Sequence, residues 1–218
     1  MNHVNEQDLI AFEGRVQDLW ESGQLPFLVH FSGGNERELV ALFGEVREGD
    51  WIFSSHRAHY HYLLAGGSPD RLERLIRDGR SMFVFDRERN FLSSSVLGGT
   101  CAIAAGVAWQ LKEAGSPNRV WCFLGDGAEE EGHLYEAVLF VDGNQLPCTF
   151  VIEDNDRSVD TDKRHRRGDA QMAWPPCVRR YHYVSTWPHA GSGCRQQITF
   201  DEKVVEKFRD PGPAGGTR

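Results

Sequence analysis

Two short apolar runs, separated by a segment with helical periodicity, constrain the fold of this chain more than any other feature. The runs, residues 120–124 and 148–152, are continuous and rich in β-branched and aromatic residues. Such runs are typical of strands that are buried on both faces of a parallel sheet. Between them, Leu134, Val138 and Val141 recur at helical spacing, and residues 129–131 place three glutamates where the first turn of that helix is expected. We therefore predict an α/β fold, a three-layer sandwich with a mainly parallel sheet flanked by helices.

Polar residues follow both runs directly. Gly125-Asp126-Gly127 follows the first run, and Asn155 closes the second, 29 positions after Asp126. A right-handed crossover brings the carboxyl ends of both strands to one edge of the sheet, so Asp126 and Asn155 are expected to meet there. Carboxylate and amide oxygens, with the backbone carbonyl of Arg157, suit Mg²⁺ or Ca²⁺. An isolated Gly-Asp-Gly is usually a tight turn, but the flanking strands and Asn155 favour a metal site.

The glycines beside Asp126 point to a phosphate ligand. Gly125 and Gly127 allow the backbone to approach phosphate oxygens closely, because a side chain would fill the space that the ligand needs. An acidic site requires a cation to accept an anion, since a like-charge contact at about 4 Å costs about 4 kcal/mol at an effective dielectric constant of about 20. The sequence therefore predicts a metal-bound phosphate group.

This arrangement resembles the thiamine diphosphate-binding signature, in which Gly-Asp-Gly precedes an Asn pair; here Asp154 replaces the first Asn. Two further segments are similar to the alpha subunit of the 2-oxo-acid dehydrogenase decarboxylase component, of the pyruvate and acetoin types. Residues 30–36 are similar to the family's His-x-x-x-Gly-Gln-Glu segment, and residues 56–59, His-Arg-Ala-His, to its cofactor-proximal stretch. The resemblance covers roughly residues 8–161.

The resemblance implies a role for each matching residue. The residues that it assigns to Mg²⁺ are Asp126, Asn155 and, through its carbonyl, Arg157. The residues that it assigns to thiamine diphosphate are His56, Arg57, Leu97, Gly125, Asp126, Gly127, Ala128, Asn155 and Arg157. The residues that it assigns to proton transfer or orientation near the thiazolium ring and the substrate are His30 and His59. Arg and His side chains suit these roles, because Arg matches phosphate oxygens and His exchanges protons near neutral pH.

The resemblance also implies a partner and a reaction. In the family, the glutamate that activates the cofactor lies on a separate pyrimidine-binding domain, so we expect a beta-type partner subunit in an alpha2-beta2 heterotetramer. The expected reaction cleaves or forms a C–C bond next to a carbonyl, with a small 2-oxo acid or ketose as substrate. We expect a small decarboxylase or carboligase, inactive without its partner. A split transketolase-like enzyme and a non-catalytic Mg-phosphate-binding module remain alternatives.

Several residues have competing interpretations. His56, His59 and His61 would bind a transition metal if they converged, although no carboxylate lies near them in sequence. His30 would be a polar strand end, and Leu97 ordinary core. The basic run of residues 163–167 favours a solvated loop, ahead of a loop that orders over diphosphate and of a nucleic-acid patch. His182 and His189 are weak site candidates.

Composition supports a single domain, residues 1–208, followed by a flexible tail, residues 209–218. With 24 basic and 32 acidic residues, the net charge of −8 disfavours nucleic acid as a partner. The five cysteines lack paired metal spacing and are expected to be reduced, which favours a cytoplasmic location. The sequence has no membrane-length apolar stretch. Helices are expected over residues 8–20, 36–46, 69–78 and 99–113, the last against another subunit, and a strand over residues 177–187.

Overall fold

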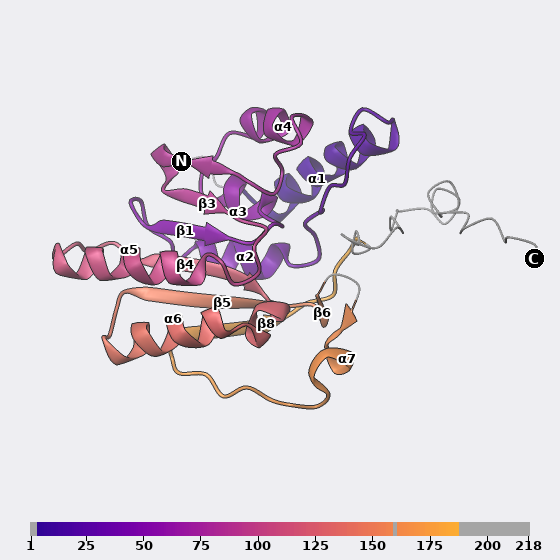
Figure 1. Ribbon diagram of the computed structural model, residues 1–218. Coiled ribbons are helices and arrows are strands. Elements are labelled where there is room, and N and C mark those ends of the chain that lie inside the picture. Colours follow the sequence, from indigo (N-terminus) through magenta and orange to yellow (C-terminus); the bar gives the residue numbers. More distant parts are fainter. Residues whose placement is uncertain (1–3, 159–160, 188–218) are drawn as a thin grey trace, which may run out of the picture.

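A six-stranded sheet forms the centre of the computed structural model, which describes residues 4–158 and 161–187 (Figure 1). The strand order is β2-β3-β1-β4-β5-β8. All neighbouring strands pair in parallel except β2, which runs antiparallel to β3 at one edge. The strands are β1 (Trp51–Ser54), β2 (Phe85–Asp86), β3 (Phe91–Ser93), β4 (Val120–Gly125), β5 (Cys148–Asp154) and β8 (Val178–His182).

The two apolar runs form the centre of this sheet, as predicted. β4 and β5 pair in parallel, with Val120 opposite Cys148 and Gly125 opposite Glu153. Every residue of β5 is buried, and so is every residue of β4 before Gly125. Burial on both faces explains why these strands have continuous apolar runs rather than an alternating pattern.

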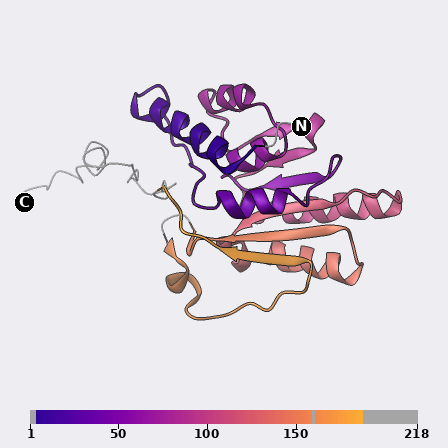
Figure 2. The ribbon, with the colours of Figure 1, turned by 180° about the vertical axis from the view of Figure 1, so that it is seen from behind.

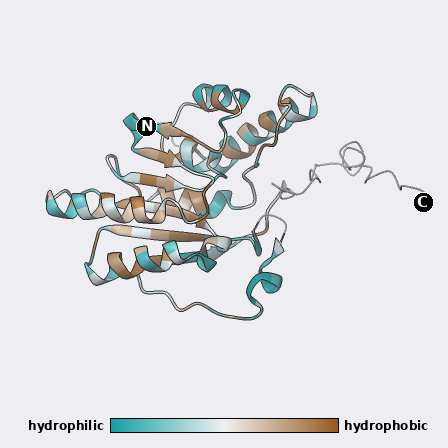
Figure 3. Cartoon of the chain, in the orientation of Figure 1, coloured by the Kyte–Doolittle hydropathy of each residue, from teal (hydrophilic) through white to brown (hydrophobic). Residues whose placement is uncertain are grey.

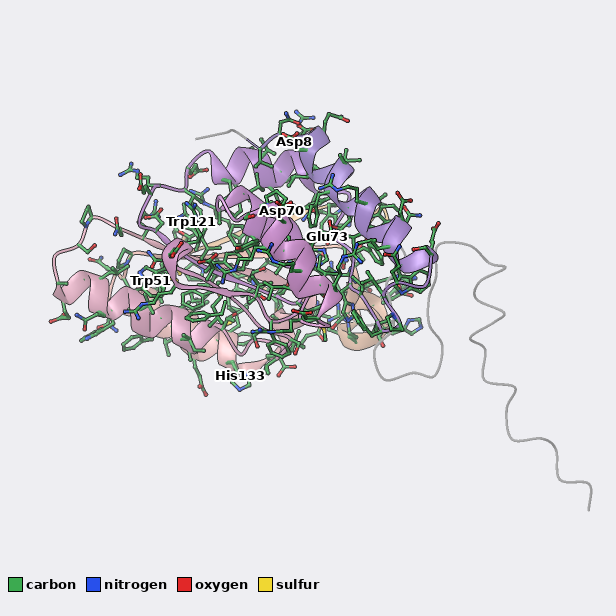
Figure 4. The ribbon with its side chains drawn as sticks, turned by 90° about the horizontal axis from the view of Figure 1, so that it is seen from above. Asp8, Trp51, Asp70, Glu73, Trp121 and His133 are labelled. Atoms are coloured by element: carbon green, nitrogen blue, oxygen red, sulfur yellow. The ribbon has the colours of Figure 1, made fainter. Side chains whose placement is uncertain are left out.

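Helices cover both faces of the sheet, which confirms the predicted three-layer sandwich (Figures 1 and 2). One face packs against α1 (Glu6–Glu21), α2 (Glu36–Phe43), α3 (His59–Leu64) and α4 (Pro69–Arg77). The other face packs against α5 (Cys101–Glu113) and α6 (Gly132–Gly143). Figure 3 shows the strands as mainly hydrophobic, and Figure 4 labels Asp8 on α1 and Asp70 on α4, which are both exposed.

Local signals define the starts of α1 and α4. Asn5 caps α1 and forms a capping box with Asp8, while Ser68 caps α4, which begins with Pro69 as expected. The helix predicted over residues 36–46 ends at Phe43, and α5 begins at Cys101. The short helix α3 was not predicted, because its six residues are too few to show a clear period.

The start of the helix between β4 and β5 was predicted wrongly. Glu129 and Glu130 lie in a separate 3-10 turn, η2 (Asp126–Glu130), and Glu131 is the residue before α6. The acidic residues therefore do not form the first turn of α6. Glu129 is instead fully buried, with its charge compensated by arginines.

Short elements connect the remaining strands. The turn η1 (Arg87–Arg89) links β2 to β3, and β6 (Arg157–Ser158) pairs with β7 (Thr161–Asp162) in a hairpin that leads into α7 (Lys163–Arg167). The strand predicted over residues 177–187 is confirmed only over the five residues of β8, because pairing with β5 ends at His182. No helix among the described residues is both long and apolar enough to cross a bilayer. His189, Cys194, the predicted boundary at residue 208 and the predicted tail lie outside the described residues.

Candidate functional site

A cavity of about 380 Å³ lies at the carboxyl ends of β1, β4 and β5. This is the edge at which open parallel sheets bind ligands. Nine of the predicted site residues line it: His30, His56, Arg57, Leu97, Gly125, Gly127, Ala128, Asn155 and Arg157. The structure thus brings together segments that lie more than a hundred positions apart in sequence. Leu97 is 40% exposed, which excludes the alternative that it is ordinary core.

Asp126 lies at the end of β4, between two glycines of the cavity wall, and its side chain is fully buried. Its Oδ2 accepts a hydrogen bond from Nη2 of Arg166, whereas its Oδ1 has no hydrogen-bond partner among the described residues. Burial raises the pKa of this carboxyl to about 6, although Arg166 acts in the opposite direction. A buried, unsatisfied carboxylate oxygen is costly, so this atom fits a site that binds a cation.

Asn155 follows the end of the neighbouring strand β5. Its Oδ1 accepts a hydrogen bond from the backbone N–H of Arg157 at 3.2 Å, and its Nδ2 lies 3.4 Å from the Tyr183 hydroxyl oxygen. These contacts hold the amide at the cavity wall, beside Gly125 and Gly127. Asp126 and Asn155 thus place a carboxylate and an amide oxygen just after the ends of two adjacent parallel strands, β4 and β5.

The two glycines beside Asp126 have different surroundings. A Cβ at Gly125 would meet nothing within 4 Å, so that it would occupy open space in the cavity. A Cβ at Gly127 would instead overlap the Ser158 side chain, with the two Cβ atoms 2.6 Å apart. Gly125 fits the predicted close approach of a ligand, while Gly127 also makes room for the β6–β7 hairpin.

Three of the four histidines considered from the sequence line the cavity: His30, His56 and His61, the last of which was considered only as a ligand of a transition metal. The ring centroids of His30 and His56 lie 4.5 Å apart. Burial, then the charge of Arg57 and then His59, lower the pKa of His30 to about 3. The guanidinium of Arg57 donates to the carbonyl oxygen of Phe31 at 2.5 Å, which ties it to the segment that carries His30.

The transition-metal alternative for the histidines is wrong. His59 is fully buried behind the cavity wall, with Nδ1 3.0 Å from Glu13, and His61 lies between Ser54 and Glu153, with Nε2 3.2 Å from Glu153. Across residues 4–158 and 161–187, no three His, Cys, Asp or Glu side chains are placed to hold a metal ion. Carboxylates that are distant in sequence therefore contact these rings: Glu13 lies at Nδ1 of His59, and Glu153 lies at Nε2 of His61.

Comparison with known proteins identifies the family. The model of the dehydrogenase E1 component matches residues 6–173 of this chain. The chain belongs to the dehydrogenase E1 component family. This confirms the resemblance that the sequence motifs indicated.

The relatives of this E1 family member include alpha subunits of two kinds. It is 31% identical, over 68% of this chain and 47% of the relative, to the alpha subunit of acetoin:2,6-dichlorophenolindophenol oxidoreductase from Bacillus subtilis (strain 168). It is 31% identical, over 70% of this chain and 50% of the relative, to the pyruvate dehydrogenase E1 component subunit alpha from Rickettsia prowazekii (strain Madrid E). The chain spans about half the length of the curated relatives that it matches.

The basic run in this E1 family member is not the solvated loop that was favoured from sequence. Arg164 and His165 are exposed, but the Arg166 and Arg167 side chains are only 11% and 9% exposed. Arg166 donates to Asp126 and Glu130, and Arg167 donates to Glu129 at 2.7 Å. Carboxylates on η2 explain the difference, because they draw two of the five side chains of the run inward.

Asp154, which replaces the first Asn of the family's pair, belongs to the same ionic network. Lys163 donates to both of its oxygens, at 2.5 and 2.6 Å, and Arg180 donates to Oδ2 through Nε at 3.0 Å. Although burial has the largest single effect and acts upward, these partners lower the pKa of Asp154 to about 2. The negative charge introduced at this position is therefore matched by two cations of this chain.

Four residues without a predicted role contact the histidines or the proposed metal ligands: Glu13, Glu153, Arg166 and Tyr183. Glu13 had a detectable signal, since it lies among the buried apolar residues of α1. The others had none, because their partners lie 28 to 92 positions away in sequence.

Proposed function

We propose that this chain is the diphosphate-binding alpha subunit of a heteromeric enzyme that uses thiamine diphosphate and Mg²⁺. The observation that carries this proposal is Asp126, a buried carboxylate with one unpartnered oxygen at the end of β4 and beside the cavity. Membership of the dehydrogenase E1 component family supports it, as do the names of the relatives. The proposed reaction cleaves or forms a C–C bond next to the carbonyl of a small 2-oxo acid.

In this proposal, Asp126, Asn155 and the carbonyl of Arg157 hold Mg²⁺, while Arg57 and His56 contact diphosphate oxygens. The cation reverses the repulsion between Asp126 and the anionic ligand. Gly125 leaves open space for the phosphates, since a Cβ there has no neighbour within 4 Å. When bound, thiamine diphosphate supplies the electron sink for bond cleavage.

Histidines of the chain are assigned to proton transfer or orientation around thiamine diphosphate. His30 is 3% exposed, and its lowered pKa keeps the imidazole neutral at physiological pH. A neutral imidazole can donate a proton from one ring nitrogen and accept one at the other. We assign His30, in the cavity wall, to proton transfer or orientation at the substrate, with His59 acting from behind it.

An apolar surface on α5 and α6 supports the proposed partner subunit. Five large side chains on these helices are 41% to 76% exposed: Ile103, Trp109, Tyr135, Leu139 and Phe140. Trp109 and Phe140 stack with their centroids 5.4 Å apart, which joins the two helices into one surface. Such a surface is typical of a protein interface. We propose that a beta-type subunit with the activating glutamate completes the site, in an alpha2-beta2 assembly.

The experiment is a calorimetric titration of the chain, co-purified with its beta-type partner, with thiamine diphosphate in the presence and absence of Mg²⁺. We expect binding that depends on the metal and that weakens at least 100-fold in Asp126→Asn. Asp142→Asn, on the exposed side of α6, is the matched control and should bind within twofold of the wild type. Binding of Mg-ADP in place of thiamine diphosphate would overturn the proposal.

A further inference from the structure

Glu13 is a fully buried carboxylate in the core-facing stripe of α1. Its buried neighbours on that helix are the apolar residues Leu9, Phe12 and Val16. Burying an ionised carboxylate is expensive unless the group is paired and hydrogen-bonded. An aliphatic side chain would serve the packing of α1 better, so the contacts of the Glu13 carboxylate must explain its presence.

These contacts join three segments at the back of the cavity wall. Oε1 of Glu13 accepts a hydrogen bond from the backbone N–H of Ser32 at 2.9 Å. Both carboxylate oxygens also lie within hydrogen-bond distance of Nδ1 of His59, at 3.0 and 3.1 Å. One carboxylate on α1 thus holds the first residue of α3 and the loop that carries His30.

The hydrogen bonding of His59 differs from that of a buried histidine with a purely structural role, because such a ring usually has a partner at each polar nitrogen. The His59 ring is fully buried, and its Nε2 has no hydrogen-bond partner among the described residues. His59 also lies close enough to His30 to contribute to the lowered pKa of that cavity residue. A carboxylate at Nδ1 places the ring proton there and leaves Nε2 as the basic nitrogen.

Other charged or titratable groups surround this pair. Arg57 and Tyr60 both lie within electrostatic reach of Glu13. The Tyr60 hydroxyl donates to Glu36 at 3.0 Å, so it is engaged with another carboxylate. Of the three side chains His59, Arg57 and Tyr60, His59 is the one within hydrogen-bond distance of the Glu13 carboxylate.

We propose that Glu13 is a positioning residue that fixes His59 with its proton on Nδ1 and its Nε2 basic, beside the His30 loop. Glu13 then acts on the reaction through His59, without touching substrate or cofactor. The inference rests on the proposed function, because it assigns a task to the histidines of that site. It adds a carboxylate–histidine pair, which lies behind the cavity wall, to the residues of the proposed site.

The first test measures the contact alone. Nitrogen-15 NMR of the histidine rings in the complex should show the His59 ring protonated at Nδ1 in the wild type. Glu13→Gln keeps the size of the side chain but removes its charge, and it should abolish this strong tautomer preference. Glu21→Gln, at the exposed end of α1, should leave the His59 spectrum unchanged. A wild-type ring protonated at Nε2 would overturn the proposal, whatever the function of the chain.

The second test asks whether Glu13 works through His59. We expect Glu13→Gln to lower kcat at least tenfold, with KM and the Kd for thiamine diphosphate within threefold of the wild type. His59→Asn keeps a donor near the position of Nδ1 but lacks Nε2, and it should lower kcat by at least as much. In the double variant, the loss should equal that of His59→Asn alone.

The outcomes separate this inference from the proposed function. Multiplied losses in the double variant would overturn the role of Glu13 through His59, while metal-dependent cofactor binding would still stand. Absence of thiamine diphosphate binding in the wild type would instead overturn the proposed function. Equal melting temperatures of wild type and Glu13→Gln, within about 3 °C, show that lost folding does not cause the effect.

Discussion

The guanidinium of Arg166 donates a hydrogen bond to Oδ2 of Asp126, the buried carboxylate proposed to bind Mg²⁺. The same guanidinium donates to Glu130 at 2.6 Å, and its Nη1 lies 3.5 Å from the position of a Cβ on Gly127. A cation of the chain thus neutralises Asp126 at the place where the metal is proposed to act. Arg166 and Mg²⁺ are therefore expected to compensate the same charge.

Arg166→Gln should destabilise the chain without metal and increase its response to metal. Removing one partner of a buried ion pair costs about 3 kcal/mol, because the other charge stays buried. Thermal unfolding with and without millimolar Mg²⁺ tests this: the metal should raise the melting temperature more in the variant than in the wild type. Arg164→Gln, whose side chain is 84% exposed, should behave like the wild type. Equal responses in Arg166→Gln and the wild type would contradict the shared charge compensation.

Gly125→Ala should separate ligand binding from folding. Since the added Cβ meets no atom within 4 Å and the backbone at Gly125 is extended, the free energy of unfolding should change by less than about 0.5 kcal/mol. The Cβ enters the cavity, so the Kd for thiamine diphosphate should rise at least tenfold. Gly127→Ala is the contrasting variant, because its Cβ overlaps Ser158 and should destabilise the hairpin. Wild-type affinity in Gly125→Ala would exclude close approach of the ligand there.

His30 should make the stability of the chain sensitive to mild acid. Its pKa is about 3 in the folded state, against about 6.5 when unfolded, so the unfolded state binds the proton more tightly. The contribution of neutral His30 to the free energy of unfolding is complete above about pH 6.5. It declines as the pH falls towards 3, and about 2 kcal/mol of it is lost at pH 5. Urea unfolding at pH 7 and pH 5 should show this loss in the wild type and a smaller one in His30→Gln. His133→Gln, on the exposed side of α6, should retain the wild-type loss.

Leu139→Asp should weaken assembly without unfolding the chain. Leu139 is 76% exposed on α6, so the substitution removes no core contact but places a charge in the apolar surface on α5 and α6. The Kd for the beta-type partner, measured by sedimentation velocity, should rise at least tenfold. Ile10→Asp, at a 47% exposed position on α1 and on the opposite side of the sheet, should leave it within twofold. Equal effects of both variants would place the interface elsewhere.

Local patterns in the sequence predicted the two central strands, the start of α4 and the edge of the sheet that carries the candidate site. The apolar runs at residues 120–124 and 148–152 indicated two buried parallel strands, and their ends placed Asp126 and Asn155 at one edge of the sheet. Ser68 and Pro69 indicated the start of α4. These predictions succeed because burial, periodicity and helix capping depend on residues that are near each other in sequence.

Only the tertiary structure decided which ionisable side chains contact one another. Glu13 and His59 lie 46 positions apart, and Arg166 and Asp126 lie 40 positions apart. Spacing along the chain carries no signal for such pairs, because their contact depends on how α1, α3, η2 and α7 pack around the sheet. The same packing turned Arg166 and Arg167 inward, against the expectation of a solvated loop, and placed His59 behind the cavity wall. The sequence thus determined at which edge of the sheet the candidate site lies, and the packing of distant segments determined how the charges of its residues are compensated.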